Sequence, residues 1–267
     1  MSIQDAERAE QNGNWNDAVL FWSECARRDK DLDCYMRLGR ALQKLQRWTE
    51  AEAAFLLAWK ADPQLYIAAE CLGSLNLYRQ DIQAADSLEN AEDWLRRALR
   101  IDRNARAMNL LGVAVESQGK SAEAQTCFEA AITLDAEYEE AYVNLAQSVQ
   151  EASPERALEL LERAIEIDPH YALAHQRAGI LKEESGDTLT AQYHFERAVE
   201  LDDQDVWSHL YLASTYAKQG EQSKARIQYA RAIELDPMND AARKFFSSFL
   251  ESIGDLDEVY KLRKESQ

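Results

Sequence analysis

Glycine and proline are scarce in this sequence, with 9 and 4 residues among 267. An all-β sandwich or barrel needs many turns, and these two residue types form most of them, so the composition disfavours that class and favours a helical protein. Long apolar runs are also missing. The longest that we find, Ala53 to Trp59, is far too short to span a bilayer. The first residues carry neither the basic nor the apolar segment of a secretory signal, and we expect a cytoplasmic protein.

Cysteine is rare, and basic residues are outnumbered. The four cysteines include no Cys-x-x-Cys pair, so we expect free thiols rather than a disulfide or zinc framework. The 30 Lys and Arg residues face 48 Asp and Glu residues, which gives a formal net charge of −18. Such a field repels phosphate groups, so we expect no nucleic-acid partner and no membrane partner.

Motifs of catalysis are missing as well. The sequence contains no Gly-x-Gly-x-x-Gly, Walker, His-Glu-x-x-His or Gly-x-Ser-x-Gly motif. His175 and His209 are 34 residues apart, and a metal pair is one interpretation of them. The favoured interpretation is that both face a neighbouring helix. We therefore expect no enzyme, no cofactor and no metal site.

What the sequence does contain is an internal repeat of about 34 residues. An Ala, an apolar residue, a further residue, a second apolar residue and an Asp recur at 131–135, 164–168, 198–202 and 232–236. Upstream of these, a Leu followed by a small residue recurs at Leu38–Gly39, Leu72–Gly73, Leu111–Gly112, Leu145–Ala146 and Leu212–Ala213. Between the two signatures, an Ala precedes a large apolar residue by four positions, as in Ala51 and Phe55 or Ala124 and Phe128. This spacing places both side chains on one helix face.

These signatures resemble the tetratricopeptide repeat family over nearly the whole chain. The resemblance implies an all-α fold, an α-solenoid of antiparallel helix pairs that stack in a right-handed superhelix. We predict about seven repeats over residues 1–239, of which the first is truncated and the third carries a six-residue insertion within 79–91. This insertion is expected to lengthen the helices. Residues 240–267 are predicted to form a degenerate repeat or C-terminal capping helices.

In this family the first helix of each pair lines the concave surface, so the resemblance implies which side chains form a partner-binding groove. These are Arg37, Arg40, Lys44, Tyr78, Asn109, Glu140, Asn144, Gln147, Glu151, Arg177, Glu183, Glu184, Trp207, Leu210 and Tyr211. Trp207 is either an anchor for a partner or a plug that packs on the C-terminal cap. Asn109, Asn144 and Arg177 match part of a clamp that some members use for a C-terminal carboxylate, but the expected Lys is missing.

The favoured function is a non-catalytic protein–protein interaction scaffold or adaptor that holds a peptide or helix of a partner in this groove. Residues 134–267 hold 27 acidic and 14 basic residues, which predicts a basic or amphipathic partner. The alternative is self-assembly into a homo-oligomer through end residues, namely Trp15, Phe21 and Trp22 or Phe245, Phe246 and Phe249. A third hypothesis is an enzyme or an RNA-processing factor. The sequence offers no nucleophile–base pair for catalysis, and the negative net charge opposes binding of a phosphate backbone.

Overall fold

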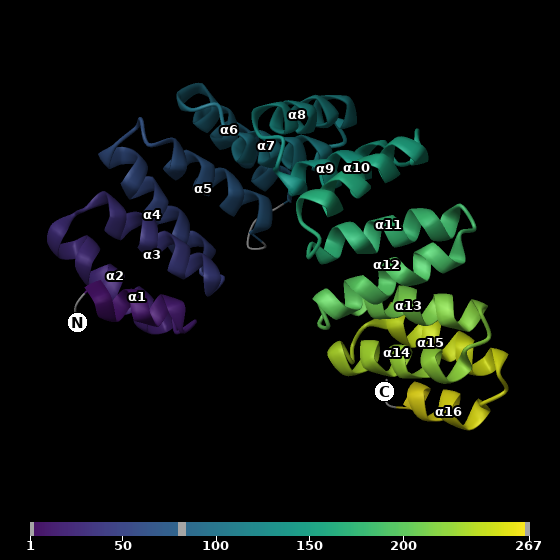
Figure 1. The fold of residues 1–267 in the computed structure, drawn as a ribbon. Coiled ribbons are helices and arrows are strands. Elements are labelled where there is room, and N and C mark those ends of the chain that lie inside the picture. Colours follow the sequence, from purple (N-terminus) through teal and green to yellow (C-terminus); the bar gives the residue numbers. More distant parts are fainter. Residues whose placement is uncertain (1–2, 80–83, 265–267) are drawn as a thin grey trace. The chain divides into compact units, whose positions relative to one another are not determined.

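The computed structural model describes residues 3–79 and 84–264. Within these ranges the chain forms sixteen α-helices and no strand (Figure 1). The all-α prediction is confirmed. The helices are α1 Ile3–Gln11, α2 Trp15–Asp29, α3 Leu32–Lys44, α4 Trp48–Ala61, α5 Tyr66–Tyr78, α6 Ala84–Ile101, α7 Ala105–Ser117, α8 Ser121–Leu134, α9 Glu139–Val149, α10 Pro154–Ile167, α11 Ala172–Glu184, α12 Thr188–Leu201, α13 Val206–Lys218, α14 Gln222–Leu235, α15 Asp240–Ser252 and α16 Leu256–Lys264.

The chain divides into two compact units, Met1–Asn144 (unit 1) and Leu145–Gln267 (unit 2). Each unit repeats one arrangement, in which a helix packs against the next one along the chain. In unit 1 this holds from α1 to α8, and in unit 2 from α10 to α16. Turns of a few residues reverse the chain between the two helices of a pair, which is how helical hairpins form. The predicted stacking of helix pairs is confirmed within each unit.

The two helices of a pair lie close together at the small residue of the first helix, which follows Leu38 in the second pair and Ala178 in the sixth. A Cβ built on Gly39 would lie 2.4 Å from Phe55 Cε1, and one on Gly179 would lie 2.6 Å from Phe195 Cε1. Both phenylalanines are fully buried. The Gly of the first helix and the aromatic ring of the second therefore form a matched pair, which explains why both signatures recur with the repeat.

Several of the turns inside the pairs use a residue with positive φ. Gly119 has a φ of 80°, and the N–H of Lys120 behind it donates to the Val115 carbonyl at 3.0 Å. Gln46 holds the corresponding place after α3 with a φ of 56°, and the N–H of Arg47 donates to Leu42 at 3.0 Å. The turn thus keeps its hydrogen bonds without a Gly, although a non-glycine residue in this region costs about 1 kcal/mol.

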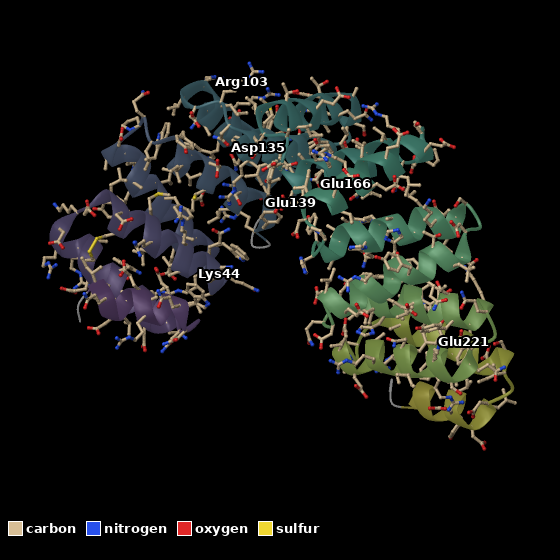
Figure 2. All side chains as sticks on the ribbon, in the orientation of Figure 1. Lys44, Arg103, Asp135, Glu139, Glu166 and Glu221 are labelled. Carbon is tan, nitrogen blue, oxygen red and sulfur yellow. A yellow bond between two sulfur atoms is a disulfide. The ribbon has the colours of Figure 1, made fainter. Side chains whose placement is uncertain are left out.

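Two of the four cysteines are bonded to each other. The sulfur atoms of Cys25 in α2 and Cys34 in α3 are joined in a disulfide, and their Cα atoms are 5.8 Å apart (Figure 2). Cys71 and Cys127 are free. The expectation of four free thiols is therefore wrong for this pair. The two cysteines are nine positions apart in the sequence, and the short turn between α2 and α3 brings them together, a contact for which the sequence shows no local motif.

The third pair contains the longest second helix. α6 has 18 residues, whereas α4 and α8 have 14 each. Segment 80–83 of the predicted insertion lies outside the described residues, so the insertion stays a prediction.

The chain continues beyond the last predicted repeat with α15 and α16. Phe246 and Phe249 of α15 are buried, and their rings lie 5.6 and 5.3 Å from that of Tyr229 in α14. At the other end, Phe21 and Trp22 are also buried. These four aromatic residues close the cores of their own units, whereas Phe245 is exposed. None of the helices in the described part of the chain has the length and apolar content needed to cross a bilayer.

Candidate partner-binding surfaces

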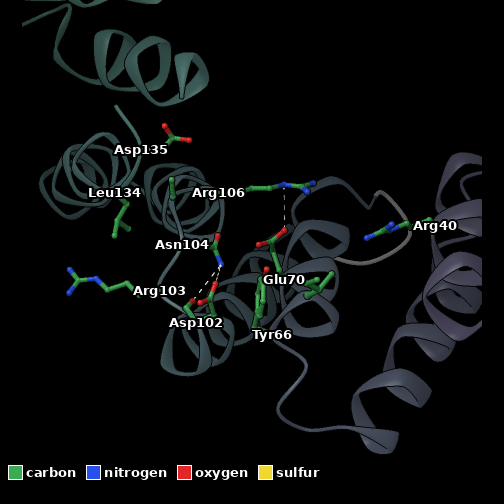
Figure 3. Close-up of a pocket in the computed structure, with 11 residues that line it drawn as sticks. Arg40, Tyr66, Glu70, Asp102, Arg103, Asn104, Arg106, Leu134 and Asp135 are labelled. Carbon is green, nitrogen blue, oxygen red and sulfur yellow. Dashed lines mark hydrogen bonds and ion pairs between the residues drawn. The ribbon is translucent and has the colours of Figure 1, made fainter. Parts of the chain in front are cut away.

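The first helices α3, α5 and α7 of unit 1 line two adjoining cavities of about 850 and 630 Å³. Three residues line both: Arg40 of α3, Glu70 of α5 and Arg106 of α7. Figure 3 shows the smaller cavity, with Arg106 reaching over Glu70 and Arg40 approaching from the side of α3. We call these two cavities together the unit 1 groove.

Arg37 serves the structure of the groove wall rather than its open surface. Its guanidinium lies 2.9 Å from Asp33, 3.3 Å from Glu10 and 3.4 Å from Glu7, and it sits over the Trp22 ring. Four partners on three helices thus hold it in place. Its charge is already balanced, so Arg37 ties α1 and α2 to α3.

Arg40 and Lys44, one turn and two turns further along α3, are exposed instead. Neither forms an ion pair with any carboxylate in the described ranges 3–79 and 84–264. Arg40 lies near the thiol of Cys71, whose pKa is raised by burial, so that Cys71 stays protonated at neutral pH. The groove therefore presents two solvated positive charges from one helix.

Glu70 is a buried acid that lines both cavities together with Arg40 and Arg106. It is only 5% exposed, and burial raises its pKa while the charges of Arg106 and Arg40 act in the opposite direction. The Nε atom of Arg106 lies 3.4 Å from a Glu70 oxygen, although the Arg106 side chain is 66% exposed. Glu70 thus anchors the base of a guanidinium whose tip faces solvent.

A polar network lies beside it on α7 and α9. The amide nitrogen of Asn144 donates to Oδ1 of Asn109 at 2.9 Å, and the hydroxyl of Tyr138 donates to Glu140 at 2.8 Å. Burial, and then the bond to Glu140, raise the pKa of Tyr138. The pKa of Tyr78 is also raised by burial and by the charge of Glu140. The structure therefore brings four of the residues expected in the groove into one cluster: Tyr78, Asn109, Glu140 and Asn144.

This pairing changes the interpretation of the partial carboxylate clamp. The Oδ1 atom of Asn109 is occupied by Asn144, and Asn109 is buried. Both amides therefore hold neighbouring repeats together. Gln147 and Glu151, which follow in unit 2, are exposed.

In unit 2 the main exposed feature is an aromatic series on α13. The Trp207 ring is 45% exposed and lies 6.2 Å from that of Tyr211, which stacks on the buried Phe195 at 5.4 Å. Leu173 of α11 is also exposed. Trp207 thus contacts Tyr211 and stays nearly half exposed, and its role as an anchor for a partner remains a prediction.

A small cavity of about 170 Å³ lies between α11 and α13, and its lining includes Leu173, Gln176, Asp205 and Ser208. Asp205 caps α13, accepting from the N–H of Ser208 at 2.8 Å and from its hydroxyl at 2.6 Å. The Gln176 amide donates to the Ser208 hydroxyl at 3.0 Å. This network fixes the spacing of α11 and α13 directly beneath the exposed apolar residues.

The remaining expected residues of unit 2 differ in what they can do. Glu183 is neutralised by Lys218 at 2.9 Å, whereas Glu184 is exposed. Arg177 is half-buried, and its Nε atom has no hydrogen-bond partner among the described residues. Leu210 is only 3% exposed and packs in the core. Its place on the contact surface is therefore corrected, because the helix turns it inward while the next residue, Tyr211, stays at the surface.

Profiles of the tetratricopeptide repeat match residues 109–172 and 177–240, and a further one matches 32–60. The chain belongs to the tetratricopeptide repeat family. Tetratricopeptide repeat proteins generally bind other proteins and are generally not catalytic, so membership supports a protein–protein interaction scaffold.

Individual similar proteins are distant from this tetratricopeptide repeat chain. It is 26% identical over 191 residues to human Protein O-mannosyl-transferase TMTC3, covering 67% of this chain and 21% of that protein. The chain thus spans about a fifth of this curated relative. The Cut9–Hcn1 hetero-tetramer of the APC/C is similar in structure, with a TM-score of 0.75, 14% identity and coverage of 92% of this chain and 48% of that one. PilF of Pseudomonas aeruginosa is also similar in structure, with a TM-score of 0.68 and 21% identity. The match covers 83% of this chain and 99% of PilF. At these identities the two structures show the fold alone.

His175 and His209 each pair with a residue of a neighbouring helix, but not with one another. Nδ1 of His175 lies 3.1 Å from Nδ1 of His194 in α12, and Nδ1 of His209 lies 2.7 Å from Gln228 in α14. Each also contacts a carbonyl six residues earlier through Nε2, at 3.2 Å. His175 and His209 thus both face a neighbouring helix. The described residues contain no group of three or more side chains that could hold a metal ion.

Sequence reasoning missed Tyr138 and Asp205, which take part in the networks above. Asp205 stands just before the first helix α13, where Asp commonly caps a helix, and that position is the signal by which it could have been found. Tyr138 stands just before α9, and no sequence signal marks it.

Proposed function

We propose that this chain is a non-catalytic adaptor in which the first helices of unit 2 bind a basic or amphipathic segment of a partner protein. Trp207 is the observation that carries the proposal. A large aromatic ring that is nearly half exposed, and held in place by Tyr211, is the kind of side chain that dominates binding energy at interfaces. The exposed Leu173 on the neighbouring first helix extends the apolar contact.

Charge supports a basic segment. Unit 2 holds 23 acidic and 14 basic residues. Glu184 at the end of α11 and Glu151 before α10 are exposed and free to face a partner. Glu183 is not, because Lys218 already neutralises it. Excess negative charge accelerates encounter with a basic segment, and this effect weakens as salt rises.

Binding to Trp207 is tested by selecting peptides from a displayed random library with the whole chain. The dissociation constants of the best binders are then measured for the wild type and for Trp207→Ala. We expect the substitution to weaken binding by about 2 kcal/mol or more, which is about 30-fold. The matched control is Leu189→Ala, since Leu189 is 78% exposed on the second helix α12. Equal affinities for the wild type and Trp207→Ala would contradict the proposal.

Self-assembly is the second candidate, and the last helix pair favours it. Phe245 of α15 and Leu256 and Tyr260 of α16 are exposed apolar residues close to one another in the sequence. A homo-oligomer would bury them in a contact between copies. Light scattering over a dilution series is the test, and a monomer at every concentration would reject this candidate.

The cytoplasmic location stays a prediction. Disulfides persist mainly in oxidising compartments, so the bond between Cys25 and Cys34 does not favour it.

A further inference from the structure

The larger cavity of the unit 1 groove has more basic than acidic lining residues, although the chain as a whole is strongly acidic. Four basic residues line it, Arg37, Arg40, Lys44 and Arg106, against the three acidic residues Glu10, Asp33 and Glu70. Its open positive groups are Arg40 and Lys44 on α3 and the exposed tip of Arg106 on α7. We propose that this groove binds an acidic segment of a partner protein through its side-chain carboxylates. This surface is separate from the one around Trp207, so the inference goes beyond the proposed function and does not rest on it.

The availability of the charges is the first argument. Every acid that lines the larger cavity is paired with an arginine. Glu10 and Asp33 are held by Arg37, and Glu70 is held by Arg106. Asp102 and Asp135 line the smaller cavity and accept hydrogen bonds from neutral groups, the Asn104 amide at 3.1 Å and the N–H of Glu137 at 3.0 Å.

The cations of the groove are not engaged in the same way. Arg40 and Lys44 have no ion pair with any carboxylate of the described chain, and both are exposed. A carboxylate entering the larger cavity therefore finds positive groups that need not first break an ion pair. In the same cavity an entering ammonium group would have to compete with Arg37 and Arg106 for their acids.

The geometry of Arg106 is the second argument. Its contact with Glu70 is through Nε, at 3.4 Å, and the end of the guanidinium extends beyond that contact (Figure 3). A guanidinium held at its base and open at its tip can bind a carboxylate through two parallel N–H groups. Since Glu70 is buried, it orients Arg106 without occupying the open part of the groove.

The remaining lining residues define the rest of the segment. Trp15 and Trp48, at the start of the second helices α2 and α4, face the larger cavity and offer partly exposed aromatic surface. Ser74 of α5 adds a hydroxyl on the opposite wall. A segment in which acidic residues alternate with an apolar residue can contact both the basic side chains and the tryptophan rings.

The test uses fluorescence anisotropy with the full chain and a fluorescein-labelled ten-residue peptide that alternates Glu and Leu. Two matched peptides carry Gln or Lys in place of each Glu. We expect the Glu peptide to bind at least 10-fold more tightly than either, and its affinity to fall as salt rises. Equal affinity of the Glu and Gln peptides would overturn the proposal.

Protein variants then locate the site. The double variant Arg40→Gln, Lys44→Gln is expected to weaken binding of the Glu peptide at least 10-fold. Both positions are exposed, so the fold is expected to persist, and a thermal melt followed by circular dichroism verifies this. Arg27→Gln is the matched control, because Arg27 is an exposed cation on the second helix α2. Unchanged binding by the double variant would place the Glu peptide elsewhere and overturn the proposal.

Trp207→Ala separates this inference from the proposed function. It is expected to leave binding of the Glu peptide unchanged while it weakens the peptides selected on unit 2. A loss of Glu-peptide binding in Trp207→Ala would show that the unit 1 groove is not the site. Failure of the proposed function has a different readout, the affinity of the selected peptides.

Discussion

The ring of Phe128 occupies the space that a Cβ atom on Gly112 would need. Such an atom would lie 2.4 Å from Phe128 Cε1, well inside van der Waals contact. Phe128 is buried in α8, and Gly112 lies in the middle of α7. The same relationship joins Gly39 to Phe55 and Gly179 to Phe195. The spacing between the two helices of a repeat is therefore set by this contact.

Gly112→Ala is expected to destabilise the chain. Alanine is favoured over glycine in a helix by about 1 kcal/mol. Forcing a methyl group into a packed contact costs about 1–3 kcal/mol, and here the clashing atoms belong to a buried ring that cannot swing aside. We expect overpacking to prevail, lowering the free energy of unfolding in urea by about 1 kcal/mol. A more stable Gly112→Ala variant would show that the ring relaxes. Adding Phe128→Leu to Gly112→Ala is expected to recover part of the loss, because the two positions are coupled.

The His175–His194 pair predicts a pH-dependent stability. Burial, and then the charges of His175 and Lys182, lower the pKa of His194 to about 4, against partial opposition from Asp187. Burial also lowers the pKa of His175, opposed by its bond to the Pro169 carbonyl and reinforced by the charge of Arg197. We assign Nε2–H of His175 to that carbonyl, so that Nδ1–H of His194 donates to Nδ1 of His175.

The unfolded chain binds the proton more readily than the folded one, since an ordinary histidine has a pKa near 6.5. The stabilisation from neutral His194 is therefore complete above about pH 6.5 and is lost as the pH falls toward 4. We expect a loss on the order of 2 kcal/mol from this group over that range. The matched variant is His194→Gln, which copies the partner that Gln228 provides to His209. Its unfolding free energy is expected to vary less over the same range, and identical pH profiles of the two proteins would refute the assignment.

The disulfide predicts a thiol count. Protein purified without reductant and then denatured is expected to expose two thiols to Ellman's reagent, those of Cys71 and Cys127. After reduction the count is expected to rise to four. Cys25→Ser is the informative variant, because it frees Cys34 and gives three thiols without reductant. Four thiols in the unreduced wild-type protein would contradict the bond.

The repeat and the helix pairs could be predicted from the sequence because they follow from spacing. A period of about 34 residues, with a small residue on one helix and a large one on the next, fixes which faces meet. The surface residues were harder to predict. Leu210 and Tyr211 are neighbours in the sequence, yet one is buried and the other reaches the surface. If the assigned register of the helix is wrong by one residue, the buried Leu210 is predicted at the surface in place of Tyr211.

Contacts between side chains were the least predictable part. Lys218 forms an ion pair with Glu183, and the Asn144 amide donates a hydrogen bond to Asn109. No pattern in the sequence distinguishes these residues from Glu184 or Gln147, which are exposed. The sign of the local charge was equally hidden. The chain carries a net charge of −18, while α3 presents Arg40 and Lys44 to the unit 1 groove. Only the arrangement of ion pairs shows which charges remain open.

The central claim is that partner segments lie on the first helices. Site-specific photo-crosslinking with a peptide selected on the chain tests it most directly. Benzoylphenylalanine is placed at Trp207 on the first helix α13 or at Leu189 on the second helix α12, both exposed positions. We predict a crosslinked peptide at position 207 and none above background at position 189. Efficient crosslinking at 189 and none at 207 would contradict the account.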